Sequence, residues 1–121
     1  MKKSISISQL QNVLVATIQV DLSHNILEDF RHHLLEKVGS HSISGVLIDL
    51  SEVKTLDRVD FDQLYTIAKT VEVMGRRCLF VGIRPGIAMA LVNVGYNTEK
   101  LPCAQSIDDG LLAVRRGPHA C

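Results

Sequence analysis

Charged side chains gather between a short apolar segment at residues 45–50 and an apolar stripe that follows at helical spacing. Asp57 precedes this stripe where its carboxylate can cap a helix, and Asp60 stands three residues later in a capping-box-like arrangement. Arg58 would occupy the first helical position, where a cation opposes the helix dipole at a cost of about 0.3–1 kcal/mol. Asp60 and Asp62 partly offset that cost. Because the free N–H groups of a helix start favour negative charge, the chemistry open to this turn is recognition of a charged group.

The place of this turn in the chain supports a binding role. In an open α/β sheet, sites gather at the carboxyl ends of the strands, and the turn follows an apolar segment that is typical of a buried strand. Arg58 has two interpretations that the residues alone leave open. Its guanidinium is either a forked donor to the carboxylate of a partner, or an ordinary exposed group neutralised by its neighbours.

The sequence lacks the motifs of familiar catalytic and cofactor sites. There is no phosphate loop with a following Lys-Ser or Lys-Thr, no GxGxxG and no Gly-x-Ser-x-Gly. His24, Glu28 and His32 recur every four residues, but a solvated helix face is favoured over a metal site because no fourth ligand is visible. We therefore expect no catalytic residue, no metal and no cofactor, and we predict that the protein is not an enzyme.

The hydrophobic pattern predicts an α/β fold. Two apolar segments at 4–10 and 13–20 are typical of an antiparallel hairpin, and later strands alternate with helices in the order β-β-α-β-α-β-α-(β)-α. Such alternation favours a mixed, mostly parallel sheet with about four helices packed largely on one face. The later strands are expected at 45–50, 78–82 and, as a short edge strand, 101–103. We predict one domain over residues 1–121, with its core at about 4–116 and a frayed tail at 117–121.

Composition narrows the class of protein. The chain has 121 residues, of which 46% are hydrophobic, so it can form a core and is not disordered. Thirteen basic and thirteen acidic residues give no net charge, which argues against a nucleic-acid binder and makes self-association easier. The apolar runs are too short to span a bilayer, and no signal-peptide core follows the N-terminus. Three cysteines without a CxxC motif indicate a reducing compartment, so a cytoplasmic location without a membrane partner is expected.

Two segments carry a family resemblance. Residues 46–57 read Val-Leu-Ile-Asp-Leu-Ser-Glu-Val-Lys-Thr-Leu-Asp, and residues 81–92 read Val-Gly-Ile-Arg-Pro-Gly-Ile-Ala-Met-Ala-Leu-Val before Gly95. The first resembles the signature of STAS domains (sulfate transporter and anti-sigma factor antagonist), and the second resembles the stressosome branch of that family. The resemblance covers residues 5–115 and is nearest to single-domain antagonists of the RsbS type.

This resemblance implies a regulatory module that binds a serine/threonine protein kinase or an anti-sigma factor. In the family, phosphorylation of a serine or threonine after the aspartate switches binding, because a phosphate adds about −1.5 to −2 charge to the interface. That position is Arg58 here, and a second phosphorylation site falls on Ala90, so neither carries a hydroxyl. We therefore predict a module locked in one binding state, with Thr55 or Ser51 as the remaining nearby hydroxyls. The expected partner-binding surface comprises Thr55, Asp57, Arg58, Val59, Asp60, Asp62, Arg84, Pro85 and Gly86.

Two other functions remain open at this point. The hairpin edge and the zero net charge suit a scaffold that forms homo-oligomers or assembles with other STAS proteins. Alternatively, the helix start at residue 58 binds a small anion or a nucleotide through its backbone N–H groups.

Overall fold

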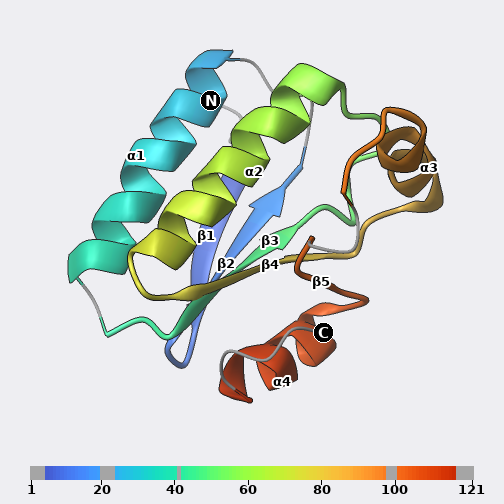
Figure 1. The fold of residues 1–121 in the computed structure, drawn as a ribbon. Helices are drawn as coiled ribbons and strands as arrows, with labels where there is room; N and C mark the ends of the chain where they lie inside the picture. The colour runs from blue at the N-terminus through green and yellow to red at the C-terminus, as the bar shows by residue number, and fades with distance from the viewer. Residues whose placement is uncertain (1–4, 20–23, 41, 98–100, 117–121) are drawn as a thin grey trace.

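The computed structural model describes residues 5–19, 24–40, 42–97 and 101–116 as one α/β unit (Figure 1). Its strands form a single sheet in the order β1-β2-β3-β4-β5. The expected sequence of elements is confirmed, whereas the expected tail at 117–121 lies outside the described residues. The elements are β1 (Ile5–Leu10), β2 (Val13–Ile18), α1 (His24–Ser40), β3 (Gly45–Asp49), α2 (Arg58–Val73), β4 (Arg77–Val81), α3 (Pro85–Asn93), β5 (Cys103–Ala104) and α4 (Ile107–Arg115).

The sheet is mixed, as the hydrophobic pattern predicts. β1 and β2 form an antiparallel hairpin in which Leu10 pairs with Val13, and β2 to β5 run parallel. Gln11 takes a φ of 56° in the connecting turn, a left-handed conformation that tight hairpin turns require. β5 begins later than expected, at Cys103, because Pro102 has no N–H to donate; its carbonyl accepts a hydrogen bond from the Phe80 amide at 3.0 Å.

Helices cover the two faces unequally (Figure 1). α1, α2 and the buried residues of α3 enclose the larger apolar core, to which Phe61 and Phe80 contribute with ring centroids 5.3 Å apart. α4 alone covers the opposite face, over a smaller cluster that includes Leu47 and Val114. Gly110 allows α4 to approach closely, since a Cβ there would lie 2.9 Å from the Leu47 side chain. The expectation that helices pack largely on one face is therefore confirmed, with α4 as the exception.

This arrangement gives the candidate site a rigid support. Every residue of β3 is buried, as expected for a continuous apolar strand with helices on both faces. β3 and β4 end side by side, and the turns after them lead directly into α2 and α3. Within the described residues, no helix has both the length and the apolar character needed to cross a membrane.

Candidate functional site

The turn after β3 is anchored at its first residues. Asp49 is the one buried charged residue in the described part of the chain, and its carboxylate accepts a hydrogen bond from the Ser51 amide at 2.9 Å. The Leu50 amide donates a hydrogen bond to the carbonyl of Val81 on the neighbouring strand at 2.9 Å. The Val53 amide donates to the Leu50 carbonyl at 3.0 Å and thereby forms a turn. These bonds fix the direction in which the chain leaves the sheet toward α2.

Asp57 caps α2, as its position in the sequence predicts. Its backbone is extended, and its carboxylate accepts a hydrogen bond from the Asp60 amide at 2.8 Å. The pKa of the Asp60 carboxyl is raised above its usual range, first by partial burial and second by the negative charge of Asp57. The leading turn of α2 therefore holds two carboxylates close together.

Arg58 is the first residue of α2 and has only weak contacts. Its Nε lies 4.0 Å from the Asp62 carboxylate, and its guanidinium carbon lies 6.0 Å from the centroid of the Tyr96 ring. The Arg58 side chain is 63% exposed and that of Asp62 is 53% exposed. Exposed ion pairs of this kind contribute about 0–1 kcal/mol, so the guanidinium stays available to another carboxylate.

The turn after β4 lies against the turn after β3. Arg84 donates from its Nη1 to the Ser51 carbonyl at 3.3 Å, which ties the two turns together. Gly82 makes this approach possible, because its φ is +70° and a Cβ there would lie 2.9 Å from the Ser51 Cβ. A Cβ on Gly86 would lie 3.8 Å from the Lys54 carbonyl, so the start of α3 also borders the first turn.

The two turns form one continuous surface at the carboxyl end of the sheet. Phe61 and Leu64 of α2 point into the core and hold the helix in place. The side chains that the sequence selects lie on the outside: Asp60 is half-buried, and the exposed ones are Thr55, Asp57, Arg58, Val59, Asp62, Arg84, Pro85 and Gly86.

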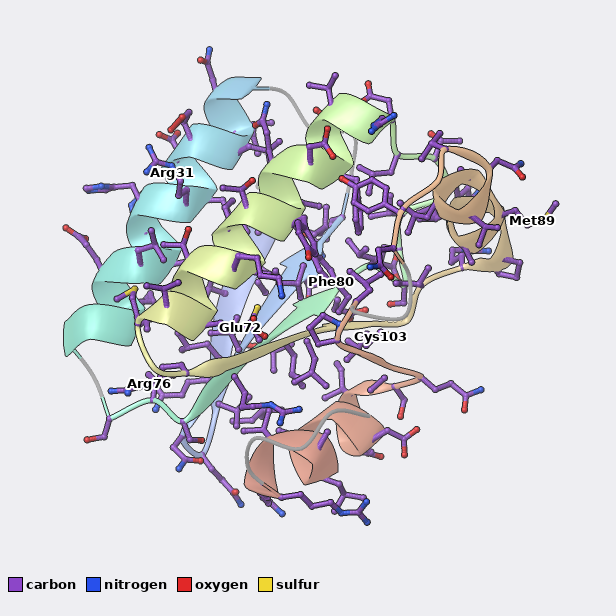
Figure 2. All side chains as sticks on the ribbon, in the orientation of Figure 1. Arg31, Glu72, Arg76, Phe80, Met89 and Cys103 are labelled. Atoms are coloured by element: carbon purple, nitrogen blue, oxygen red, sulfur yellow. The ribbon has the colours of Figure 1, made fainter. Side chains whose placement is uncertain are left out.

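Sequence reasoning missed an apolar extension of this surface on α3. Met89 is 65% exposed and Val92 is 62% exposed, and no residue of Pro85–Asn93 is charged. Figure 2 shows Met89 pointing outward from α3. Ala90 is exposed on the same helix, and Val94 follows it at 41% exposure. An uncharged helix with large apolar side chains in water is typical of a surface that another molecule covers.

Tyr96 is the second residue that sequence reasoning missed. Its ring meets Phe61 edge to face at 5.0 Å and contacts Tyr65 at 6.0 Å, so it is held against α2. Its position follows from the end of α3, where Gly95 takes a φ of +81° and the Tyr96 amide donates to the Leu91 carbonyl at 3.1 Å. Gly95 is the feature of the sequence that indicates a reversal of the chain after α3, which brings Tyr96 back toward α2.

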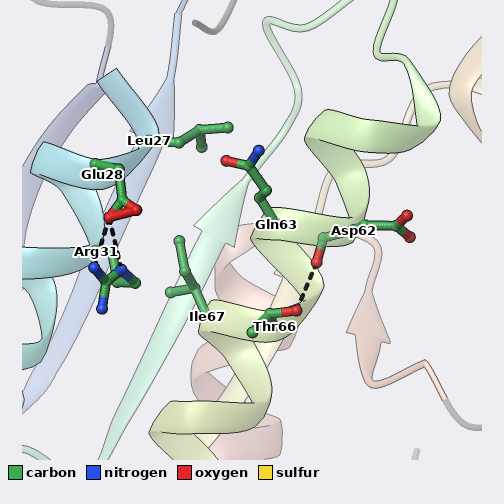
Figure 3. A pocket seen from close by; sticks show the side chains of 7 residues that line it. All are labelled: Leu27, Glu28, Arg31, Asp62, Gln63, Thr66 and Ile67. Carbon is green, nitrogen blue, oxygen red and sulfur yellow. Dashed lines mark hydrogen bonds and ion pairs between the residues drawn. The ribbon is translucent and has the colours of Figure 1, made fainter. Parts of the chain in front are cut away.

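A shallow groove of about 280 Å³ lies between α1 and α2 (Figure 3). Leu27 and Ile67 form its apolar floor. Three of its polar side chains already have partners: Arg31 pairs with Glu28 at 2.5 Å, and the Thr66 hydroxyl donates to a backbone carbonyl of α2 at 2.9 Å. The groove therefore offers no set of converging, unsatisfied polar groups that would define a ligand.

The sequence had raised a metal site on α1 as the less favoured interpretation. Glu28 pairs with Arg31, His32 lies 3.4 Å from Glu36, and the side chain of His24 is outside the described residues. Within the described part of the chain, no three His, Cys, Asp or Glu side chains come together as metal ligands.

The STAS domain family model matches residues 4–110, and the chain belongs to that family. It is similar to the RsbT co-antagonist protein RsbRA of Bacillus subtilis (strain 168), with 31% identity over 98 residues. That match covers 81% of this chain and 34% of RsbRA. YezB of the same strain is 36% identical over 55 residues, which are 46% of this chain and 56% of YezB. The chain thus spans a third to a little over half of these relatives.

Solved structures share the fold. A variant of RsbS from Moorella thermoacetica superposes with a TM-score of 0.80 at 22% identity, covering 93% of this chain and 95% of that one. A chain from the molecular architecture of the stressosome gives a TM-score of 0.76 at 21% identity, covering 92% and 96%. The Bacillus cell fate determinant SpoIIAA in its phosphorylated form gives 0.67 at 12%, covering 92% and 99%. The resemblance drawn from residues 46–57 and 81–92 is therefore confirmed.

Proposed function

We propose that this chain is a non-enzymatic regulatory module of the anti-sigma-antagonist or stressosome type. It binds a serine kinase or an anti-sigma factor through the turn at 55–62, the segment Arg84–Gly86 and the exposed face of α3. The observation that carries this proposal is the pairing of an accessible cation, Arg58, with an adjoining uncharged apolar helix face. Interfaces commonly place apolar anchors at their centre and charged groups that set register around them.

Arg58 gives the module a fixed charge. The resemblance to the family assigns the phosphoacceptor role to this position, and arginine accepts no phosphate from a Ser/Thr kinase. Its charge is opposite to that of a phosphoserine, so a partner that fits Arg58 presents a carboxylate there. Ala90, at the second expected phosphorylation position, has no hydroxyl either. The module accordingly binds in one state instead of alternating between two.

Two features of the site disfavour the alternative of a small anion or nucleotide binder. The Asp60 amide at the helix start already donates a hydrogen bond to the Asp57 carboxylate, so it is not open to a bound anion. Asp60 and Asp62 add negative charge to the same turn, which repels a phosphate group. A carboxylate-bearing protein surface approaches Arg58 from outside without entering the helix start.

Binding and phosphorylation measurements test the proposal together. Candidate serine kinases and anti-sigma factors from the same genome are titrated against the wild type, Arg58→Lys and Arg58→Glu. We expect Arg58→Glu to weaken binding at least about tenfold, which corresponds to about 1.4 kcal/mol. Arg58→Lys keeps the charge and loses less affinity.

The same mixtures are then incubated with ATP and analysed by peptide mass spectrometry. Binding that ATP leaves unchanged, with no phosphate on the chain, supports a module locked in one state. Stoichiometric phosphate on Thr55 or Ser51 would overturn the locked state. Equal affinity of the wild type and Arg58→Glu for every bound partner would remove Arg58 from the interface.

Assembly with other STAS domains is the second candidate function. It is favoured by the similarity of this fold to a chain of the stressosome and by the six-residue strand β1 at the edge of the sheet. Docking of a partner on α2 and α3 leaves that edge unoccupied, so the two functions are compatible.

A further inference from the structure

The two edges of the sheet are protected to different degrees. β5, at one edge, has two residues, and the preceding Pro102 has no N–H to offer to another strand. β1, at the other edge, has six residues, and no described strand pairs with its outer side. Figure 1 shows β1 at the margin of the sheet, beneath α1.

The β1 strand lacks the features by which proteins protect an open edge. Its sequence, Ile-Ser-Ile-Ser-Gln-Leu, contains no charge and no proline, and its pairing with β2 is continuous without a bulge. Natural edge strands are usually short, charged, bulged or covered, because unpaired backbone groups bind a further strand. Leu10, at the end of this strand, is 45% exposed. An uncharged, regular edge of this kind is typical of a strand that pairs with another chain.

The hairpin determines which backbone groups point outward. In a hairpin closed by a two-residue turn, the flanking pair, here Leu10 and Val13, exchanges both hydrogen bonds, and bonded pairs then alternate along the strand. Ser8 and Ser6 therefore bond to β2 through their backbones. The N–H and C=O groups of Ile5, Ile7 and Gln9 face away from the sheet.

We propose that β1 pairs with β1 of a second copy of this chain, antiparallel, about a two-fold axis at Ile7. This register sets Ile7 opposite Ile7 and Ile5 opposite Gln9 of the other copy. All the outward backbone groups of residues 5, 7 and 9 then find partners, whereas an axis at Ile5 or Gln9 leaves some of them unpaired. The pairing joins two five-stranded sheets into one continuous sheet.

The side chains of β1 suit this register. Ile5 and Ile7 are half-buried against the larger core, and in the dimer they bury more of their surface beneath α1 of both copies. On the other face, Ser6 lies opposite Ser8 of the second copy, so small neutral side chains meet there. The absence of charge in residues 5–10 means that no like charges oppose each other across the axis.

The inference rests on the proposed assembly function and is independent of the docking role of Arg58. Cysteine cross-linking tests the register. In a Cys103→Ser, Cys121→Ser background, Ile7→Cys places two thiols in a bonded antiparallel pair, whose Cα atoms lie about 5.5 Å apart, a separation that a disulfide spans. Ser8→Cys is the matched control, because position 8 faces Ser6 of the other copy and the two introduced thiols then lie too far apart to join.

We expect the Ile7→Cys protein to form disulfide-linked dimers at least about tenfold faster than Ser8→Cys under mild oxidation. Gln9→Pro removes one outward N–H and leaves the bonds to β2 intact, so it is expected to raise the dimer dissociation constant about tenfold in sedimentation equilibrium. Gln9→Ala keeps the N–H and is expected to dimerise like the wild type. Circular dichroism checks that both variants fold.

Three results would overturn the inference. The first is a wild-type chain that stays monomeric at high concentration, which leaves the Arg58 binding assay unaffected. The second is faster cross-linking of Ser8→Cys than of Ile7→Cys. The third is a dimer that a folded Gln9→Pro variant forms as well as the wild type. If Gln9→Pro fails to fold, the cross-linking rates decide alone.

Discussion

The guanidinium carbon of Arg58 lies 6.0 Å from the centroid of the Tyr96 ring, so the first residue of α2 meets the segment that follows α3. The ring is itself fixed by its edge-to-face contact with Phe61 at 5.0 Å. Arg58 thus has a negative neighbour on its own helix, Asp62, and an aromatic neighbour on another segment. In the proposed complex, a partner group that reaches the Arg58 guanidinium lies next to both of these neighbours.

A double-mutant cycle measures this contact. Arg58→Ala, Tyr96→Leu and the double variant are compared with the wild type by urea unfolding. We expect a coupling free energy of about 0.5–1 kcal/mol, because exposed cation–π pairs contribute in that range. Arg58→Ala combined with Val73→Ala is the control and should be additive, since Val73 lies at the opposite end of α2 from Arg58. Additivity of the Arg58 and Tyr96 changes would show that the ring does not hold the guanidinium.

The apolar face of α3 is expected to contribute to binding and little to stability. Replacing Met89 and Val92 by Gln leaves the core unchanged, because both side chains are more than half exposed. Partner affinity should fall about tenfold or more if these residues are interface anchors, while the free energy of unfolding changes by about 0.5 kcal/mol or less. Val73→Gln, at the far end of α2 and 88% exposed, is the matched control. Equal losses for the control and the double variant would contradict a specific role of α3.

The sequence predicts well the strands and helices that support the site, because buried elements have a recognisable pattern of apolar residues. β3 was recognisable as a continuous apolar segment, since helices on both faces exclude polar residues from it. Asp57 was recognisable as a cap because capping depends on a few consecutive residues. Such features are local, so the sequence alone contains the information that specifies them.

The parts that were missed depend on how segments meet. α3 is apolar on all sides, so periodicity does not tell which of its residues face the core and which, such as Met89, face water. Tyr96 reaches Arg58 only because a left-handed glycine turns the chain back after α3. The placement of α4 on the opposite face depends on the close contact between Gly110 and Leu47. The sequence pattern within α4 does not predict this contact, because Leu47 belongs to a distant strand.

Gly82 is expected to control the contact between the two turns. Gly82→Ala adds a Cβ in a left-handed conformation and directly against Ser51, so both strain and a clash result. We expect a loss of about 2–4 kcal/mol in the free energy of unfolding, together with displacement of Arg84. Gly95→Ala is the control that carries strain without a clash, since its φ is +81° and nothing lies within 4 Å of the added atom. Equal losses for both variants would show that backbone strain alone explains the effect.

Asp60 is expected to make stability depend on pH in the direction opposite to that of a salt-bridged carboxylate. Its pKa in the folded protein is raised above the ordinary value of 3.8, first by desolvation and second by Asp57. The folded state therefore binds a proton more tightly than the unfolded state, and this group lowers stability as the pH rises through the raised pKa. At a pH below the ordinary pKa of 3.8, Asp60→Asn should have the same free energy of unfolding as the wild type. As the pH rises toward 6, the variant should become increasingly more stable than the wild type, as measured by urea unfolding. Asp57→Asn keeps a capping oxygen but removes the neighbouring charge, so it should reduce the pH dependence only in part, because desolvation remains. A difference between the wild type and Asp60→Asn that stays constant from pH 3 to pH 6 would contradict the raised pKa.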